Sequence, residues 1–169
     1  MTDAIDTNRR GFLTRLSKPV TSLSAQAEPT PRIAARPPQA VDEALFTRLC
    51  DGCGKCADAC PNSIVHIREG LARIDMDYNE CSLCQECTKV CPTGALNVNI
   101  EAHIDLIPSF SQGCDNYLQL ACTLCQSSCT LAAIQIEEDE LPRLDTALCN
   151  GCGQCQSSCY VNAISMVAS

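Results

Sequence analysis

Sixteen cysteines arranged in four groups constrain the fold of this 169-residue chain more than any other feature. Groups one, two and four share the spacing C-x2-C-x2-C-x3-C, whereas the third group has a longer first interval. Stretches of similar length separate group one from group two and group three from group four, which indicates two repeated units. The groups are Cys50, Cys53, Cys56 and Cys60; Cys81, Cys84, Cys87 and Cys91; Cys114, Cys122, Cys125 and Cys129; and Cys149, Cys152, Cys155 and Cys159.

The rest of the composition indicates that something other than an apolar core stabilises the chain. There is no Trp, and there are only three Phe and three Tyr, so disulfide bonds or metal must add stability. An even number of cysteines would suit a secreted disulfide scaffold. However, no secretory signal peptide is visible, and cysteines in tight triplets suit one metal centre better than cross-links that span the chain. We therefore expect metal binding.

The repeated spacing favours iron–sulfur clusters over zinc. C-x2-C-x2-C-x3-C is the run found in bacterial ferredoxins, and Pro61 and Pro92 follow groups one and two as they do there. A zinc site uses two pairs of cysteines and does not need a third cysteine in step. Here every group has such a third cysteine, so we predict four [4Fe–4S] clusters.

The ligand sets follow from the crossover of paired ferredoxin clusters, in which the last cysteine of one group binds the cluster of the other group. Gly52 and Gly54, like Gly151 and Gly153, permit the positive φ that a cluster-binding loop needs. We call the predicted sets cages one to four. They are, in order, Cys50, Cys53, Cys56 and Cys91; Cys81, Cys84, Cys87 and Cys60; Cys149, Cys152, Cys155 and Cys129; and Cys114, Cys122, Cys125 and Cys159.

The third group departs from the pattern, which leaves two possibilities open for cage four. Seven residues separate Cys114 from Cys122. Thr130 and Tyr160 stand where groups one and two have proline. Either the lengthened loop still supplies its three ligands, or Cys114 lies off the site and the cluster is [3Fe–4S] or absent. We favour an intact cluster because Cys129 and Cys159 both occupy the crossover position.

The predicted fold is α+β, with two tandem bacterial-ferredoxin-like 2[4Fe–4S] modules behind a disordered N-terminal arm. Short β-branched runs around turns predict a hairpin in each module and a strand that closes it. Short helices are expected within 80–90 and 121–133. The predicted parts are a basic flexible arm, 1–41; module one, 42–100; a linker, 101–113; and module two, 114–169. The predicted strands are 64–67, 71–74 and 95–100 in module one, and 133–136, 141–144 and 163–167 in module two.

Several other residues have ordinary roles that outweigh functional ones. Sixteen cysteines already fill four cages, so His66 and His103 are expected to be surface residues. Tyr78, Tyr117 and Tyr160 are expected to pack near clusters and not to be redox-active. The acidic run 137–140 fits either a solvated hairpin turn or a docking site for a basic partner.

The chain shows no sign of an enzymatic site of its own. There is no Ser–His–acid arrangement, P-loop or G-x-G-x-x-G motif, so we expect no independent enzymatic activity. The formal net charge is −8, and sixteen thiolates would make the holoprotein more acidic still. We therefore expect no binding to nucleic acid or anionic membranes, and no apolar run is long enough to span a bilayer.

Specific motifs resemble the NapF-type ferredoxin-like accessory proteins of the bacterial periplasmic nitrate reductase system. The most telling is Gly113–Cys114 followed by seven residues before Cys122. The others are the segments 9–14, 36–38, 50–56, 80–84 and 148–153. The resemblance implies a cytoplasmic protein that contacts the precursor of the nitrate reductase catalytic subunit before export, with a proposed role in assembling or reducing its iron–sulfur cluster.

The N-terminal segment and the function leave alternatives open. Residues 7–13 look like a twin-arginine export signal, but no sustained apolar stretch follows them, so we interpret the segment as a mimic or a docking element. The protein is expected to assist maturation of the reductase precursor by electron or cluster transfer. The alternatives are a general polyferredoxin that carries electrons between unrelated enzymes, and a scaffold whose clusters only hold the fold.

Overall fold

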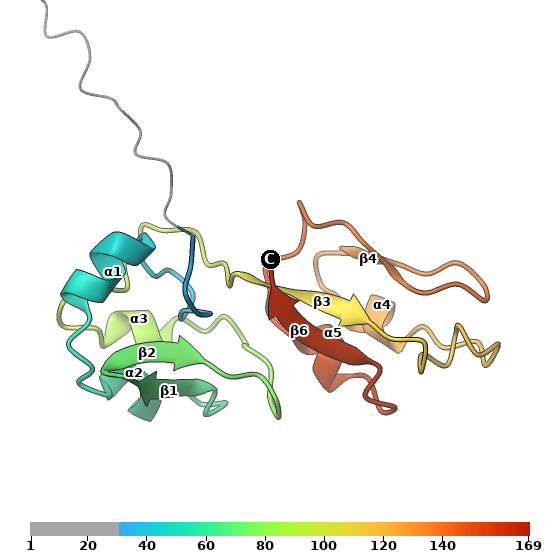
Figure 1. Ribbon diagram of the computed structural model, residues 1–169, viewed down its shortest axis with the longest axis horizontal. Coiled ribbons are helices and arrows are strands. Elements are labelled where there is room, and N and C mark those ends of the chain that lie inside the picture. Colours follow the sequence, from blue (N-terminus) through green and yellow to red (C-terminus); the bar gives the residue numbers. More distant parts are fainter. Residues whose placement is uncertain (1–30) are drawn as a thin grey trace, which may run out of the picture.

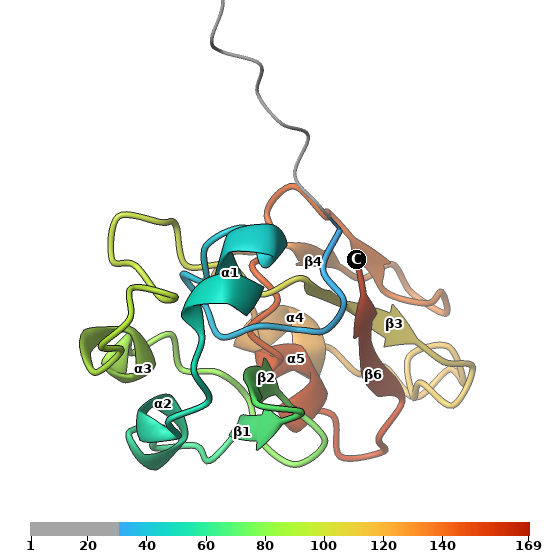
Figure 2. The same ribbon diagram turned by 60° about the vertical axis from the view of Figure 1, so that its left-hand side comes forward.

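The computed structural model describes residues 31–169, which form two units arranged along the long axis of the molecule (Figure 1). Short helices α2 and α3 lie side by side in the first unit, and α4 and α5 do so in the second (Figure 2). The first unit contains α1 (Glu43–Leu49), α2 (Lys55–Asp58), β1 (Val65–Arg68), β2 (Leu71–Ile74) and α3 (Glu86–Lys89). The second contains β3 (Leu106–Phe110), α4 (Leu124–Ser128), β4 (Ile134–Gln135), β5 (Arg143–Leu144), α5 (Gln154–Ser157) and β6 (Ile164–Ala168). This is the predicted α+β fold with two tandem modules.

The two predicted hairpins are present. Strands β1 and β2 pair antiparallel from Val65↔Ile74 to Arg68↔Leu71, and β4 pairs with β5 through Ile134↔Leu144. Glu69 and Gly70 both have positive φ, +53° and +75°, which is the backbone of a tight two-residue hairpin turn. The acidic turn makes the second hairpin shorter than predicted. In each unit the hairpin lies between the two cysteine groups in the chain.

The predicted linker 101–113 is wrong where it contains β3. This strand pairs antiparallel with β6, from Leu106↔Ala168 to Phe110↔Ile164. Pro108 pairs with Met166 within it, which is tolerated because β3 has a neighbour on one edge only. The last strand of the second module therefore closes on a strand that precedes its first cysteine.

In module one, too, the segment after the last cysteine pairs with a segment that precedes the first cysteine. This pairing corrects the predicted strand 95–100 and the predicted end of the arm at residue 41. No strand forms at 95–100; instead Ala40 and Leu96 form an isolated antiparallel bridge. The amide of Val41 donates to the Ala95 carbonyl at 3.1 Å, and that of Asn97 to the Gln39 carbonyl at 2.9 Å. Residues 39–41 thus belong to module one and not to an arm.

The predicted arm boundary at residue 41 is also contradicted by the burial of Arg36, which is 1% exposed. Its Nε donates to Glu43 Oε2 at 3.1 Å and its Nη1 donates to the Ala72 carbonyl at 2.9 Å. Its guanidinium lies over the Phe46 ring, 4.8 Å from the centroid. The predicted arm residues 1–30, with the twin-arginine-like segment, lie outside the described residues.

The two modules differ in how much apolar core they contain. Module one buries a cluster that includes Phe46, Ile64 and Ile74. The buried cluster of module two contains two large aliphatic residues, Ile134 and Ile164, and two cysteines; the small side chains of Ala133 and Ala163 are buried as well. The folded state of module two should therefore depend more than that of module one on the group that its cysteines bind.

The backbones of the two modules meet at the second and fourth cysteine groups. The amide of Cys81 donates to the carbonyl of Cys152 at 2.8 Å, and the amide of Ile104 donates to the carbonyl of Asn150 at 3.0 Å. Cages two and three therefore face each other across the junction. Among the described residues, no helix is long and apolar enough to cross a membrane.

Substituting Gly151 is expected to disrupt this junction. A Cβ added there would lie 2.2 Å from the Ile104 carbonyl oxygen and 2.7 Å from that of Leu106, so the strand must move. Gly70 is the matched control, because its φ is also positive and its added Cβ meets nothing within 4 Å; it carries only the backbone strain, about 1–2 kcal/mol. We expect Gly151→Ala to lower the thermal midpoint of the holoprotein clearly more than Gly70→Ala. Equal shifts would contradict this account of the junction.

Candidate metal centres

The loops of groups one and four are built by the same local interactions. The Asp51 carboxylate accepts a hydrogen bond from the Cys53 amide at 3.1 Å, and the Asn150 side chain accepts one from the Cys152 amide at 3.2 Å. Asx residues stabilise turns in this way. The glycines that flank Cys53 and Cys152 have φ between +68° and +82°, as the sequence predicted. The sequence pattern Asx-Gly-Cys-Gly therefore specifies the loop.

Group two adopts a similar loop without glycine. Leu83 and Gln85 flank Cys84 with φ of +53° and +63°. A residue other than glycine in this region costs about 1–3 kcal/mol and persists where the surroundings over-determine it. In group three Ala121, which precedes Cys122, has φ +46°. The loop conformation is thus retained where the local sequence disfavours it, as expected if the cysteines must surround a common centre.

All four groups continue into the same turn after their last cysteine. The residue three positions later has positive φ in every case, between +52° and +75°; these residues are Ser63, Gly94, Ala132 and Asn162. The amides of Ala133 and Ala163 donate to the sulfurs of Cys129 and Cys159, each at 3.3 Å. Thr130 and Tyr160, which replace proline, therefore leave this turn intact.

Three cavities are each lined by four cysteines of one predicted cage. In each, three cysteines come from one group and the fourth from the partner group, as the crossover requires. The cysteines are Cys81, Cys84, Cys87 and Cys60; Cys50, Cys53, Cys56 and Cys91; and Cys149, Cys152, Cys155 and Cys129.

The cysteines of cage four also lie near one another. Cys114 and Cys122 are close enough to Cys125 to raise its pKa, and Cys122 and Cys159 both act on the pKa of Tyr160. The lengthened interval therefore does not carry Cys114 away from its group. Ligation of a cluster by this set, and by the other three, stays a prediction.

Burial raises the pKa of the third cysteine in each group. The pKa is about 11 for Cys56 and Cys125 and about 12 for Cys155, and that of Cys87 is raised as well. Neighbouring cysteines add to the effect. Such thiols stay protonated in the protein alone, whereas a cationic iron–sulfur core would stabilise four adjacent thiolates.

These features fit a group larger than one ion. All sixteen cysteines lie within residues 31–169, and the structure describes them as free. Across the same residues, no three His, Cys, Asp or Glu side chains converge on a point that could hold a single metal ion. The cysteines instead surround cavities whose other walls include Ile64, Val65 and Ile74. An apolar wall limits access of water to a bound cluster.

A contact that sequence analysis missed joins the two ends of cage four. The Tyr160 hydroxyl donates a hydrogen bond to the Asp115 carboxylate, and this bond raises the pKa of Tyr160 to about 12. Tyr160 follows Cys159 and Asp115 follows Cys114. A tyrosine in place of the usual proline was the only sequence signal. We infer that the contact holds the lengthened loop beside the last cysteine of its cage.

Tyr160→Phe is therefore expected to loosen the loop 114–122. The amides of Leu118 and Leu120, which donate to the carbonyls of Cys114 and Asp115, should exchange hydrogen for deuterium faster than in the wild-type protein. Tyr78→Phe, at a side chain that is 94% exposed, is the control and should change nothing. Unchanged exchange at Leu118 and Leu120 in Tyr160→Phe would contradict a positioning role.

Other candidate residues lie away from the cages. His66 and His103 are exposed, in agreement with their predicted place on the surface. Tyr78 is almost fully exposed and does not pack on a cage. The acidic residues 137–140 form an exposed turn in which Arg143 pairs with Glu137 and Glu140.

Comparison with known protein families identifies the kind of centre. Residues 49–95 match the family described as 4Fe-4S dicluster domain, and residues 142–165 match the 4Fe-4S binding domain. The matches cover cysteine groups one, two and four. The chain is thus a ferredoxin-type iron–sulfur protein with 4Fe–4S domains. The number of clusters stays a prediction, because group three lies outside both matched segments.

Whole-chain similarity identifies the particular family. The chain is 32% identical to the ferredoxin-type protein NapF of Escherichia coli K12, over 95% of this chain and 94% of the relative. It is 37% identical to an uncharacterized protein of Haemophilus influenzae, over 94% of this chain and 90% of the relative. It is 30% identical to the methylamine utilization ferredoxin-type protein MauM of Methylophilus methylotrophus, over 70% of this chain and 62% of the relative. The chain belongs to the NapF-type ferredoxin family.

Proposed function

We propose that this protein binds the cytoplasmic precursor of the periplasmic nitrate reductase catalytic subunit and assists its maturation before export. The similarity to NapF across nearly the whole chain carries the proposal. The motifs quoted above imply this role through their resemblance to NapF-type accessory proteins. The protein acts in the cytoplasm and has no independent enzymatic activity.

The residues of the four cages hold the redox groups in this proposal. Bound [4Fe–4S] clusters supply one-electron transfer at low potential. The sixteen cysteines provide the ligands, and the amides of Ala133 and Ala163 hydrogen-bond ligand sulfurs, which tunes the clusters. Ile64, Val65 and Ile74 line the wall of cage two and shield it from water. The protein delivers electrons or cluster components to the precursor on which it docks.

An anaerobic binding assay tests the proposal. The holoprotein is immobilised and presented with the catalytic subunit that carries its export signal, and separately with the processed subunit. We expect retention of the unprocessed subunit and weaker retention of the processed one. If neither form is retained, the proposed function is wrong.

A general polyferredoxin is the second candidate, and the similarity to MauM favours it. That relative is named for methylamine utilization, so this kind of iron–sulfur chain is not restricted to one system. A carrier should accept and donate electrons with several unrelated redox proteins at comparable rates. Partner preference separates the two candidates, because a carrier serves several unrelated redox proteins at comparable rates, whereas a docking protein binds the unprocessed catalytic subunit more tightly than unrelated redox proteins.

A further inference from the structure

Charge is distributed very unevenly over module two. No Asp, Glu, Lys or Arg occurs between Asp115 and Glu137, nor after Asp145. Apart from Asp115 and Asp145, the charged residues of the module are the four acidic residues 137–140 and Arg143, which pairs with two of them. Glu138 and Asp139 at the tip of this turn are exposed. The module therefore combines an uncharged surface with one concentrated acidic patch.

The lengthened loop of group three exposes large apolar side chains on that uncharged surface. Tyr117 is 40%, Leu118 54% and Leu120 65% exposed. Water-facing Leu and Tyr side chains clustered within four residues are unusual on a small module and are typical of interaction sites. In module one the exposed apolar residues, such as Tyr78 and Val98, lie far apart in sequence.

The backbone of this loop forms internal hydrogen bonds. The amide of Leu118 donates to the Cys114 carbonyl at 3.0 Å and that of Leu120 to the Asp115 carbonyl at 2.8 Å. Gln119, between the two leucines, has φ +66°. The loop is thus folded on itself with its apolar side chains outward, so binding through it would require little further ordering.

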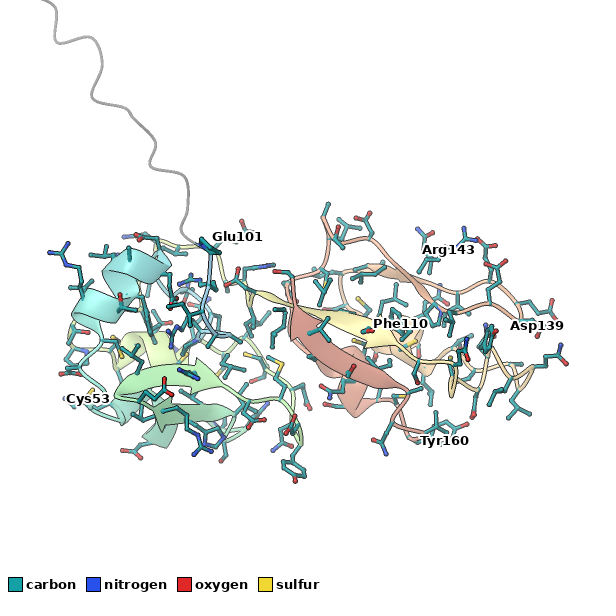
Figure 3. All side chains as sticks on the ribbon, in the orientation of Figure 1. Cys53, Glu101, Phe110, Asp139, Arg143 and Tyr160 are labelled. Carbon is teal, nitrogen blue, oxygen red and sulfur yellow. The ribbon has the colours of Figure 1, made fainter. Side chains whose placement is uncertain are left out.

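Asn116 joins the apolar loop to the acidic turn. Its side-chain nitrogen donates to the carbonyls of Glu137 and Glu140, at 2.7 and 2.8 Å, and the residue is buried. Loop 115–121 and turn 137–140 therefore form one continuous surface, which we call the distal surface. Figure 3 shows Asp139 of this surface at the end of the molecule opposite Cys53. Loop 115–121 also connects two cysteines of cage four, Cys114 and Cys122.

We infer that the distal surface is where this protein docks its protein partner, an apolar patch bordered by Lys or Arg on the catalytic subunit precursor. The inference rests on the proposed function. Leu118 and Leu120 supply the apolar contact, and Glu138 and Asp139 attract the basic border and fix the orientation. Pairing of two copies of this chain through the surface would bring two acidic turns together, which disfavours self-association.

Two double variants test the surface. Leu118→Ser with Leu120→Ser removes the apolar contact, and Glu138→Lys with Asp139→Lys reverses the charge. The matched controls lie in or beside module one: Tyr78→Ser with Val98→Ser, and Asp77→Lys with Glu101→Lys, all at exposed residues. Each protein must first contain as much iron as the wild-type protein. If Leu118→Ser with Leu120→Ser contains less iron than the wild-type protein, the inference is judged on the binding of Glu138→Lys with Asp139→Lys alone.

The measured quantity is the dissociation constant for the unprocessed catalytic subunit, determined without air at low and at high salt. Both distal variants should bind at least about tenfold more weakly, and both control pairs should bind like the wild-type protein. High salt should weaken the wild-type complex more than that of the charge variant. If the wild-type protein binds and the distal variants bind equally well, the inference is wrong while the proposed function stands. If the wild-type protein does not bind, both fail. A wild-type dimer that the distal variants abolish would also overturn the inference.

Discussion

Removal of iron by a chelator without air is expected to unfold module two completely, while part of module one stays folded. Apart from cysteines, the buried cluster of module two contains Ile134 and Ile164, and burying a side chain of this size contributes about 1.5–3 kcal/mol. That is far below the conformational entropy of ordering the module. Ligation of the clusters must supply the difference, so metal binding and folding of this module are the same event.

Hydrogen exchange measures this outcome segment by segment. After chelation the amides of β3 and β6 should exchange at the rate of an unfolded chain. The amides of β1 and β2, next to Phe46, Ile64 and Ile74, should keep part of their protection. The control is the holoprotein treated identically with iron-saturated chelator. Persistent protection of β3 and β6 without iron would show that apolar packing alone holds module two.

The second large effect is expected from Arg36. Its guanidinium and the Glu43 carboxylate are both nearly fully buried, 1% and 4% exposed, and its hydrogen bond is the main reason that the pKa of Glu43 is lowered. Removing one partner of a buried ion pair costs about 3–5 kcal/mol when the remaining charge is uncompensated. Here Arg32 Nη1 lies 3.5 Å from Glu43 Oε2 and stays as a second partner, so the expected loss is about 3 kcal/mol, the lower end of this range. Arg36→Met should therefore destabilise module one by this amount, even though the sequence around it looks like a flexible arm.

The opening free energy of the β1 amides reports this change without requiring reversible unfolding of the whole holoprotein. Arg36→Met combined with Glu43→Leu should recover much of the loss, because two apolar residues leave no buried charge. Arg73→Ala is the control, since the ion pair of Arg73 with Glu69 is solvent-exposed and contributes little. An Arg36→Met protein as stable as Arg73→Ala would mean that the buried pair does not hold residues 36–41 in place.

The sequence predicted what depends on local spacing. Cysteines two residues apart, with Asx and glycine between them, define loops 50–56 and 149–155, and short β-branched runs define the hairpins. The crossover of Cys60 and Cys91 also followed from spacing, and these residues line the cavities of the partner groups. Such features can be predicted from the sequence because they depend only on neighbouring residues or on an internal repeat.

What the sequence did not predict depends on partners far along the chain. Pro37, Pro38 and Pro108 indicate irregular structure, so the sequence predicts an arm that includes residues 39–41 and a linker where β3 lies. Their pairing with 95–97 and β6 is visible only in the fold. Burial of Arg36 likewise depends on Glu43 and Ala72. The contacts of Asn116 and Tyr160 could not be found from spacing, because the lengthened interval has no counterpart in the other three groups.

Iron and acid-labile sulfide per chain, measured on protein purified without air, test most directly whether cysteine-bound clusters organise residues beyond the N-terminal segment. We predict about sixteen atoms of each, the content of four [4Fe–4S] clusters. About twelve of each would remove one cluster, with cage four the first candidate. A colourless, iron-free protein that keeps the protection of β3 and β6 would contradict the account.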